Sequence, residues 1–177
     1  VDEVGQLRMA FDQMRISLKA RLEELNSLLK VSQGVAANLD ISEAARPILE
    51  AALMGEASSA RLVFVPEVAL EGPERRPGAF GAGPAAMLYA SFDSQLFELA
   101  RQQEMISLAH VARSRRIQIN RGAPSPGALL ALSIRHDNRY YGVLWVAFDR
   151  ARKFSEEEIR FLSTLAGEAA LAASSAW

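Results

Sequence analysis

Few side chains in this chain of 177 residues could carry chemistry. It has two histidines, His110 and His136, and no cysteine. The lack of cysteine excludes disulfides, thiolate metal sites, a cysteine nucleophile and a thioether-linked cofactor. The patterns HExxH, GxSxG and GxxxxGKS/T do not occur, so neither histidine has a recognisable catalytic or metal-binding partner. We therefore predict a non-catalytic chain with no metal and no identified cofactor; an unknown small-molecule ligand is left open.

The remaining candidate motifs have simpler explanations. His136 stands at a predicted hairpin corner and is expected to be solvated. The pattern around His110 favours a half-exposed histidine, or one whose hydrogen bonds are satisfied within the fold, over a metal or haem ligand. No periodic helix directly follows the glycines of residues 78–83, which argues against a phosphate loop. The arginines of residues 113–121 lack interleaved aromatic residues, which favours a solvated face. The net charge of -1 provides no field for steering nucleic acid, so no nucleic-acid partner is predicted.

The first 30 residues carry a narrow apolar stripe of helical period. Its members alternate three- and four-residue steps, except for two consecutive four-residue steps around Leu18. Such a stripe with charged flanks is typical of a coiled coil, and the doubled step forms a stutter. We predict a homodimer through this helix; the alternative is an amphipathic helix lying along its own domain. The predicted dimer seam consists of Val4, Leu7, Phe11, Met14, Leu18, Leu22, Leu25 and Leu29.

The opening stretch DEVGQLRMAFDQM resembles the start of the second helix of HAMP domains, the linkers that follow a membrane helix in bacterial sensor proteins. The resemblance rests on Asp2, Glu3, Gly5, Leu7, Phe11 and Met14. It implies that residues 1–38 are the end of a HAMP helix and a coiled-coil signalling helix. It also implies an upstream membrane segment, so that this chain would be the cytoplasmic portion of an inner-membrane-anchored protein.

Beyond this helix, an α+β order of elements is predicted. A helix over 38–57 has Asp40 or Ser42 as its N-cap and buries Ile48, Leu49, Ala52 and Leu53. The helix must start close to Pro47 or kink there, because proline cannot donate a helical hydrogen bond. The elements that follow are a strand over 60–66, a long loop over 67–90, a helix over 92–105 with Asp93 or Ser94 as cap, a short helix over 106–114 and an edge strand over 116–120.

The last 50 residues carry the clearest local signals. Residues 127–149 read as two strands joined by a turn at residues 136–139, because Asp and Asn tolerate the conformations that a tight hairpin requires. Ser155 and Glu158 form a capping box before the final helix, with Phe154 and Ile159 placed as a hydrophobic staple.

This ending resembles the closing hairpin and helix of GAF domains, which are small sensory modules of signalling proteins. The matching residues are Tyr141, Gly142, Val143 and Leu144 on the strand, Phe154 to Glu157 before the helix, and Leu162 and Ala166 within it. The resemblance extends with less detail back to about Leu39, so residues 39–177 are predicted to form a GAF domain with helices packed on an antiparallel sheet. It implies neither a bilin, which members attach through cysteine, nor a cyclic nucleotide, since the N-K-F-D-E set is not reproduced.

The GAF resemblance also implies a ligand pocket on one side of the sheet, closed by the long connection and the middle helices. An alternative is that the large side chains simply fill this space. The pocket candidates are Phe80, Met87, Tyr89, Phe92, Phe97 and His110.

We therefore expect a sensory or regulatory GAF module that relays a ligand-driven or HAMP-driven change through a dimeric helix to a downstream output domain, such as a histidine kinase or nucleotide cyclase. The alternative is a structural dimerisation module with a filled pocket.

Overall fold

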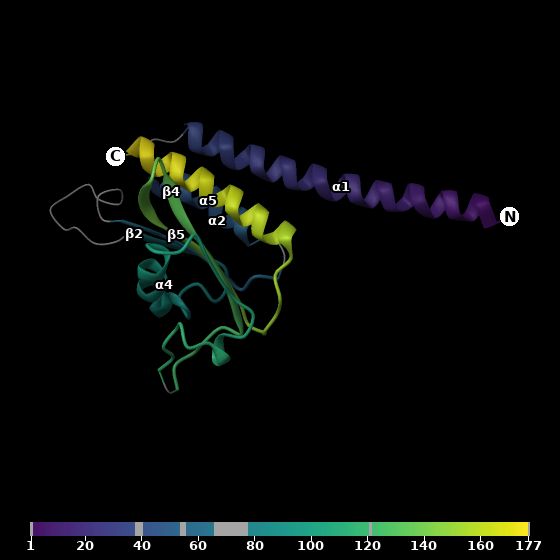
Figure 1. The fold of residues 1–177 in the computed structure, drawn as a ribbon. Helices are drawn as coiled ribbons and strands as arrows, with labels where there is room; N and C mark the ends of the chain where they lie inside the picture. The colour runs from purple at the N-terminus through teal and green to yellow at the C-terminus, as the bar shows by residue number, and fades with distance from the viewer. Residues whose placement is uncertain (1, 38–40, 54–55, 66–77, 121, 177) are drawn as a thin grey trace.

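A five-stranded antiparallel sheet in the order β2-β1-β5-β4-β3 forms the centre of the domain. The computed structural model describes residues 2–37, 41–53, 56–65, 78–120 and 122–176. Helices α2 and α5 pack on one face of the sheet and α4 packs on the other, as Figure 1 shows. The predicted α+β class, with a long N-terminal helix, is confirmed.

The elements follow one another in a simple order along the chain. The strands are β1 (Ser59–Phe64), β2 (Gly78–Ala82), β3 (Met105–Leu108), β4 (Ala128–His136) and β5 (Arg139–Phe148). The helices are α1 (Asp2–Ala37), α2 (Ile41–Ala52), α4 (Asp93–Ala100) and α5 (Glu156–Ala176), with single 3-10 turns η1 (Ala90–Phe92) and η2 (Val111–Arg113).

The predicted hairpin is confirmed as β4 and β5. His136 pairs with Arg139, and the two residues between them, Asp137 and Asn138, have φ values of 51° and 62°. Two consecutive positive φ angles define the tight turn whose twist matches the flanking strands. The turn therefore sets the pairing of the residues next to it, and an irregularity between Ile134 and Arg135 shifts the register of the rest of the β4–β5 pairing by one residue.

The predicted capping box of the final helix is also confirmed. The Glu158 amide donates to Ser155 Oγ at 3.1 Å, and the Ser155 amide donates to Glu158 Oε1 at 3.1 Å. Phe154 and Ile159 both pack against the core. The start of α5 is thus fixed by residues within five positions of one another.

Helix α2 buries the residues expected of it. Ile48, Leu49 and Ala52 are buried, and Leu53 packs against the core just beyond the helix end. Pro47 lies inside α2, which begins only six residues earlier at Ile41. Ser42 is therefore a helical residue and not the N-cap, while the other cap candidate, Asp40, lies outside the described residues.

Four predictions between residues 67 and 120 are wrong. The predicted loop contains β2, the predicted short helix begins as strand β3, and residues 116–120 form no strand. In addition, the helix predicted to reach residue 105 ends at Ala100. The reason is tertiary pairing: β2 is held by β1, and β3 supplies the edge beside β4. Residues 66–77 of the predicted loop lie outside the described residues.

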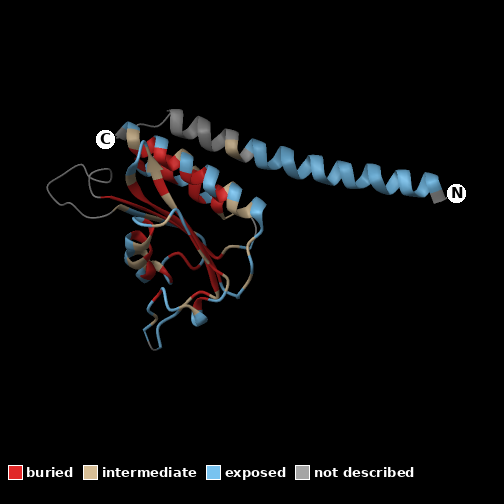
Figure 2. Cartoon of the chain, in the orientation of Figure 1, coloured by how far each residue is buried: buried red, intermediate tan, exposed pale blue. Residues whose placement is uncertain are grey.

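Helix α1 is continuous over the predicted length and leaves the domain as a rod. Its side chains are described for residues 3–26 and for Leu28; the former are all exposed, and Leu28 packs against the core (Figure 2). The C-terminal part of α1 contacts α2 and α5. Within the described residues, none of the helices combines the length and apolar character needed to cross a bilayer.

Candidate functional site

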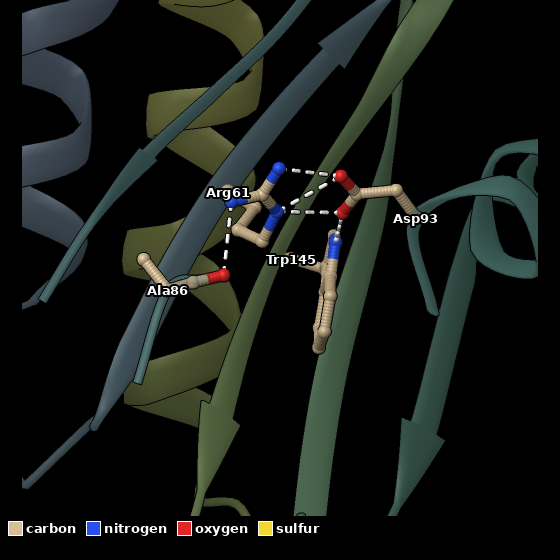
Figure 3. A network of polar contacts seen from close by, with 4 residues as sticks. All are labelled: Arg61, Ala86, Asp93 and Trp145. Carbon is tan, nitrogen blue, oxygen red and sulfur yellow. Dashed lines mark hydrogen bonds and ion pairs between the residues drawn. The ribbon is translucent and has the colours of Figure 1, made fainter. Parts of the chain in front are cut away.

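A buried polar network occupies the face of the sheet that α4 covers (Figure 3). Arg61 Nε donates to both carboxylate oxygens of Asp93 at 2.8 and 2.9 Å, and its Nη2 donates to Oδ2 at 2.7 Å. Arg61 Nη1 donates to the Ala86 carbonyl oxygen at 2.9 Å, and Trp145 Nε1 donates to Asp93 Oδ1 at 2.8 Å. The two charged side chains are only 7% and 13% exposed, so their charges are compensated inside the fold.

The sheet register explains how these groups meet. Arg61 on β1 is paired with Gly81 on β2 and with Trp145 on β5, so all three positions share one face. A Cβ at Gly81 would lie 2.5 Å from Arg61 Nη1. Gly81 therefore leaves the space in which the guanidinium group lies.

Three of the sequence candidates contribute buried side chains to the segment that covers this face. Tyr89, Phe92 and Phe97 are all buried, in the turn before η1, in η1 and in α4. Tyr89 Oη donates to Asp149 Oδ1 at 2.7 Å. Burial, with the Asp149 hydrogen bond and charge, raises the pKa of Tyr89 to about 12, so this hydroxyl stays protonated at neutral pH.

Phe97 belongs to an aromatic and cationic cluster at the end of α4. Its ring meets Tyr140 edge-on at 5.4 Å, and the Arg101 guanidinium lies 4.8 Å from the Phe97 ring centre. Tyr140 Oη donates to the Phe97 carbonyl oxygen at 2.6 Å, and burial raises the pKa of Tyr140. Arg135 Nη2 donates to the Ala100 carbonyl oxygen at 3.1 Å, which compensates the end of the helix.

The other three candidates lie elsewhere. Phe80 points to the opposite face of the sheet, where its ring meets Phe64 edge-on at 6.1 Å and borders a hollow of about 480 Å³ between α2 and β2. Met87 is 85% exposed, and His110 is exposed at the start of η2. The structure therefore does not bring the six candidates together around one cavity.

The residues at the centre of the network, Arg61, Asp93 and Trp145, are not among the site residues that the sequence predicts. The sequence predicts Asp93 or Ser94 as a helix cap, which is wrong: the N-cap of α4 is Phe92, and both residues lie inside the helix. The Asp93 carboxylate is directed to the sheet. The signal present in the sequence was Arg61, a charged residue within the apolar run ARLVFV. A charge in a buried strand requires a partner, although the pattern alone does not say which one.

A family model for the GAF domain matches residues 38–173. The chain belongs to the GAF family. A search of curated proteins found no match. The five-stranded sheet of this chain, with α2 and α5 on one face, is the GAF fold expected from the closing hairpin and helix.

Solved structures share this GAF fold at low sequence identity. One is the GAF domain of a phosphoenolpyruvate-protein phosphotransferase from Coxiella burnetii, with a TM-score of 0.59 and 17% identity over 84% of this chain and 91% of that chain. Another is a methyl-accepting chemotaxis protein, residues 122 to 287, with a TM-score of 0.58 and 14% identity over 80% and 93%. A third is a free methionine-R-sulfoxide reductase from Neisseria meningitidis, with a TM-score of 0.53 and 12% identity over 86% and 89%.

Replacing Phe97 with alanine is expected to lower the free energy of unfolding by about 3 kcal/mol, because a buried ring and its contact with Tyr140 are lost. Urea denaturation measures this loss. A variant with unchanged stability and an altered response to a small molecule would instead identify Phe97 as part of a ligand site.

Neither histidine is expected to matter for folding. His110 is exposed, and His136 lies at the hairpin corner with its Nε2 3.4 Å from an Asp137 carboxylate oxygen. His110→Ala and His136→Ala should therefore change the free energy of unfolding by less than about 0.5 kcal/mol. Substrate turnover by this chain that either change abolished would contradict the non-catalytic prediction.

Proposed function

We propose that this GAF domain is a non-catalytic regulatory relay that works as a homodimer joined through α1. The observation that carries the proposal is the exposure of the apolar seam on a continuous helix. The seven seam residues from Val4 to Leu25 are each between 57% and 69% exposed; the side chain of the eighth, Leu29, lies outside the described residues. A narrow apolar stripe of this length is stable in water only when another helix covers it.

The side of α1 that faces its own domain supports an intermolecular partner. The groove between α1 and α5 is lined on α1 mainly by small and polar residues, with Leu25 as the apolar exception. The lining residues are Ser17, Ala20, Arg21, Glu24 and Leu25 of α1 with Glu157 and Arg160 of α5. Helix α1 thus turns a mainly small and polar side toward α5. The seam residue Leu25 lies at this groove, but the other six seam residues whose side chains are described do not line it, which disfavours the alternative that the seam packs on its own domain.

The contact between α1 and α5 could transmit a conformational change from α1 to the GAF domain. The two helices lie side by side and run in the same direction, so a rotation or shift of α1 changes the packing of α5 (Figure 1). The stutter around Leu18 is the element that could adopt two packings.

We further propose an upstream HAMP unit in an inner-membrane-anchored bacterial protein, with this domain on the cytoplasmic side and an output domain downstream. Relatives of the same fold in a chemotaxis protein and a phosphotransferase are consistent with a signalling role.

A disulfide scan tests the dimer directly, because the chain has no cysteine. In a parallel, in-register dimer, Leu18→Cys places two thiols across the seam, and mild oxidation should convert most of the protein into covalent dimer. Gln13→Cys is the matched control, since residue 13 is exposed but lies outside the seam of the same helix and should give little covalent dimer. Equal crosslinking of both variants would contradict a specific seam.

The same crosslink separates a relay from the alternative, a purely structural dimerisation module. In a relay, locking Leu18→Cys as a disulfide should change amide hydrogen exchange in α5, because the packing of α1 on α5 depends on the state of the coiled coil. A structural module should show the same exchange in α5 before and after oxidation. Gln13→Cys, treated identically, controls for the oxidant.

A further inference from the structure

The Arg61 side chain is held as a bound ligand would be held. One edge of its guanidinium, Nε and Nη2, donates two parallel hydrogen bonds to the Asp93 carboxylate, and Nη1 donates to the Ala86 carbonyl oxygen. This is the geometry by which a planar cation with several N–H donors is recognised. In Figure 3 the Asp93 carboxylate lies on one side of the guanidinium and the Ala86 carbonyl oxygen on another. The side chain is only 7% exposed, so this recognition takes place away from solvent.

The receiving groups belong to segments that are remote from Arg61 along the chain. Asp93 begins α4, Ala86 lies in the turn before η1, Trp145 lies on β5, and Gly81 on β2 provides the open space. Each group is fixed by its own contacts. Trp145 Nε1 orients the carboxylate, and the Ala86 amide donates to the Gly83 carbonyl oxygen at 3.3 Å. Most of the site would therefore persist if the end of the Arg61 side chain were removed.

We propose that the α4 face of this GAF domain is a guanidinium-binding site that the chain fills with its own Arg61. The chemical class of ligand that fits is a planar monocation with at least three N–H donors, such as guanidinium or methylguanidinium. An ammonium ion carries the same charge but cannot donate the two parallel hydrogen bonds that a guanidinium edge donates to Asp93. The proposal concerns β1, α4 and β5 and does not depend on the dimer through α1, so either can fail without the other.

The Arg61 guanidinium also joins the sheet to the segment that covers it. This segment consists of the turn that holds Ala86, η1 and the first residue of α4, Asp93, and both Ala86 and Asp93 accept hydrogen bonds from Arg61. Removing the cation leaves the Asp93 carboxylate buried with Trp145 as its only remaining partner among those described above, which is unfavourable in an apolar environment. The occupant of the site therefore controls how firmly this segment is held on the sheet.

Chemical rescue tests the proposal. Arg61→Ala should melt roughly 10 °C below the unchanged chain. Low millimolar methylguanidinium chloride should then raise its melting temperature by several degrees, with a dependence on concentration that saturates as binding requires. Methylammonium chloride is the matched salt control. The unchanged chain, whose site is filled, should respond equally to both salts.

Two further variants test whether methylguanidinium binds at the Asp93 carboxylate. In Arg61→Ala/Asp93→Asn the carboxylate is gone, so methylguanidinium should have no more effect than methylammonium. With Trp177→Phe as background, Trp145 is the sole tryptophan, and its fluorescence reports occupation next to Asp93. If Arg61→Ala does not fold alone, the readout is its recovery of native near-UV signal on refolding with methylguanidinium. Equal effects of the two cations on Arg61→Ala, or rescue that persists without the carboxylate, would overturn the proposal.

Discussion

Lysine at both Leu18 and Leu22 is expected to weaken the proposed dimer of this chain at least about a hundredfold while leaving the GAF domain folded. In a parallel dimer these residues meet their own copies at the stutter. Four ammonium groups would then be buried close together, and both their desolvation and their mutual repulsion are unfavourable. A loss of about 3 kcal/mol of association free energy corresponds to that change in the dissociation constant.

Sedimentation equilibrium at micromolar concentration measures the effect. The matched control is Gln6→Lys/Gln13→Lys, which adds the same charge at two exposed positions outside the seam. It should leave the dimer within a few-fold of the unchanged chain. A residual weak dimer through α5 is compatible with the proposal. A fully intact dimer in the Leu18 and Leu22 variant would show that the seam does not join the subunits, and the relay would lose its physical basis.

Replacing Gly142 with alanine is expected to lower the free energy of unfolding by more than about 4 kcal/mol, enough to prevent stable folding of a typical domain. Gly142 has φ of 152°, in a region that residues with a Cβ rarely adopt. An added Cβ would lie 2.0 Å from the Val63 carbonyl oxygen and 2.9 Å from the Phe64 Cα. Both atoms belong to the backbone of β1, so relief requires β1 and β5 to separate at the centre of the sheet.

The chain supplies a matched glycine control. Gly167 is exposed in α5, and a Cβ there would have no atom within 4 Å, so Gly167→Ala should raise the free energy of unfolding by about 0.5–1 kcal/mol. Urea denaturation of both variants gives the comparison. A Gly142→Ala chain as stable as the unchanged protein would show that β1 and β5 can adjust, contrary to the close packing expected of a domain core.

The features that could be predicted from the sequence are those that depend on residues close together along the chain. Asp137 and Asn138 specify the hairpin turn, and Ser155 with Glu158 specifies the start of α5, because each device acts within a few residues of backbone. The regular apolar steps of α1 likewise specify a helix from their own spacing. The GAF family was identifiable from the closing hairpin and helix for the same reason: their signals are local.

Tertiary structure alone decided the middle of the fold and the composition of the α4 face. Strand β2 has the weak strand sequence GAFGA and exists because β1 pairs with it. That pairing directs Phe80 to the α2 face, away from Tyr89 and Phe97, although all three were reasonable pocket candidates by residue type. A one-residue change of register would reverse this, and nothing in the local pattern specifies it.

The Arg61 network is the clearest example of contacts that local sequence patterns do not specify. Asp93 lies 32 residues from Arg61 and 52 residues from Trp145, so no local spacing links the three. The sequence determined that a charge within the strand ARLVFV needs compensation, since an unpaired buried charge is costly. Only the crossing of α4 over β1 and β5 decided that Asp93 supplies it, because contacts between remote segments are set by how the elements pack and not by the residues beside them.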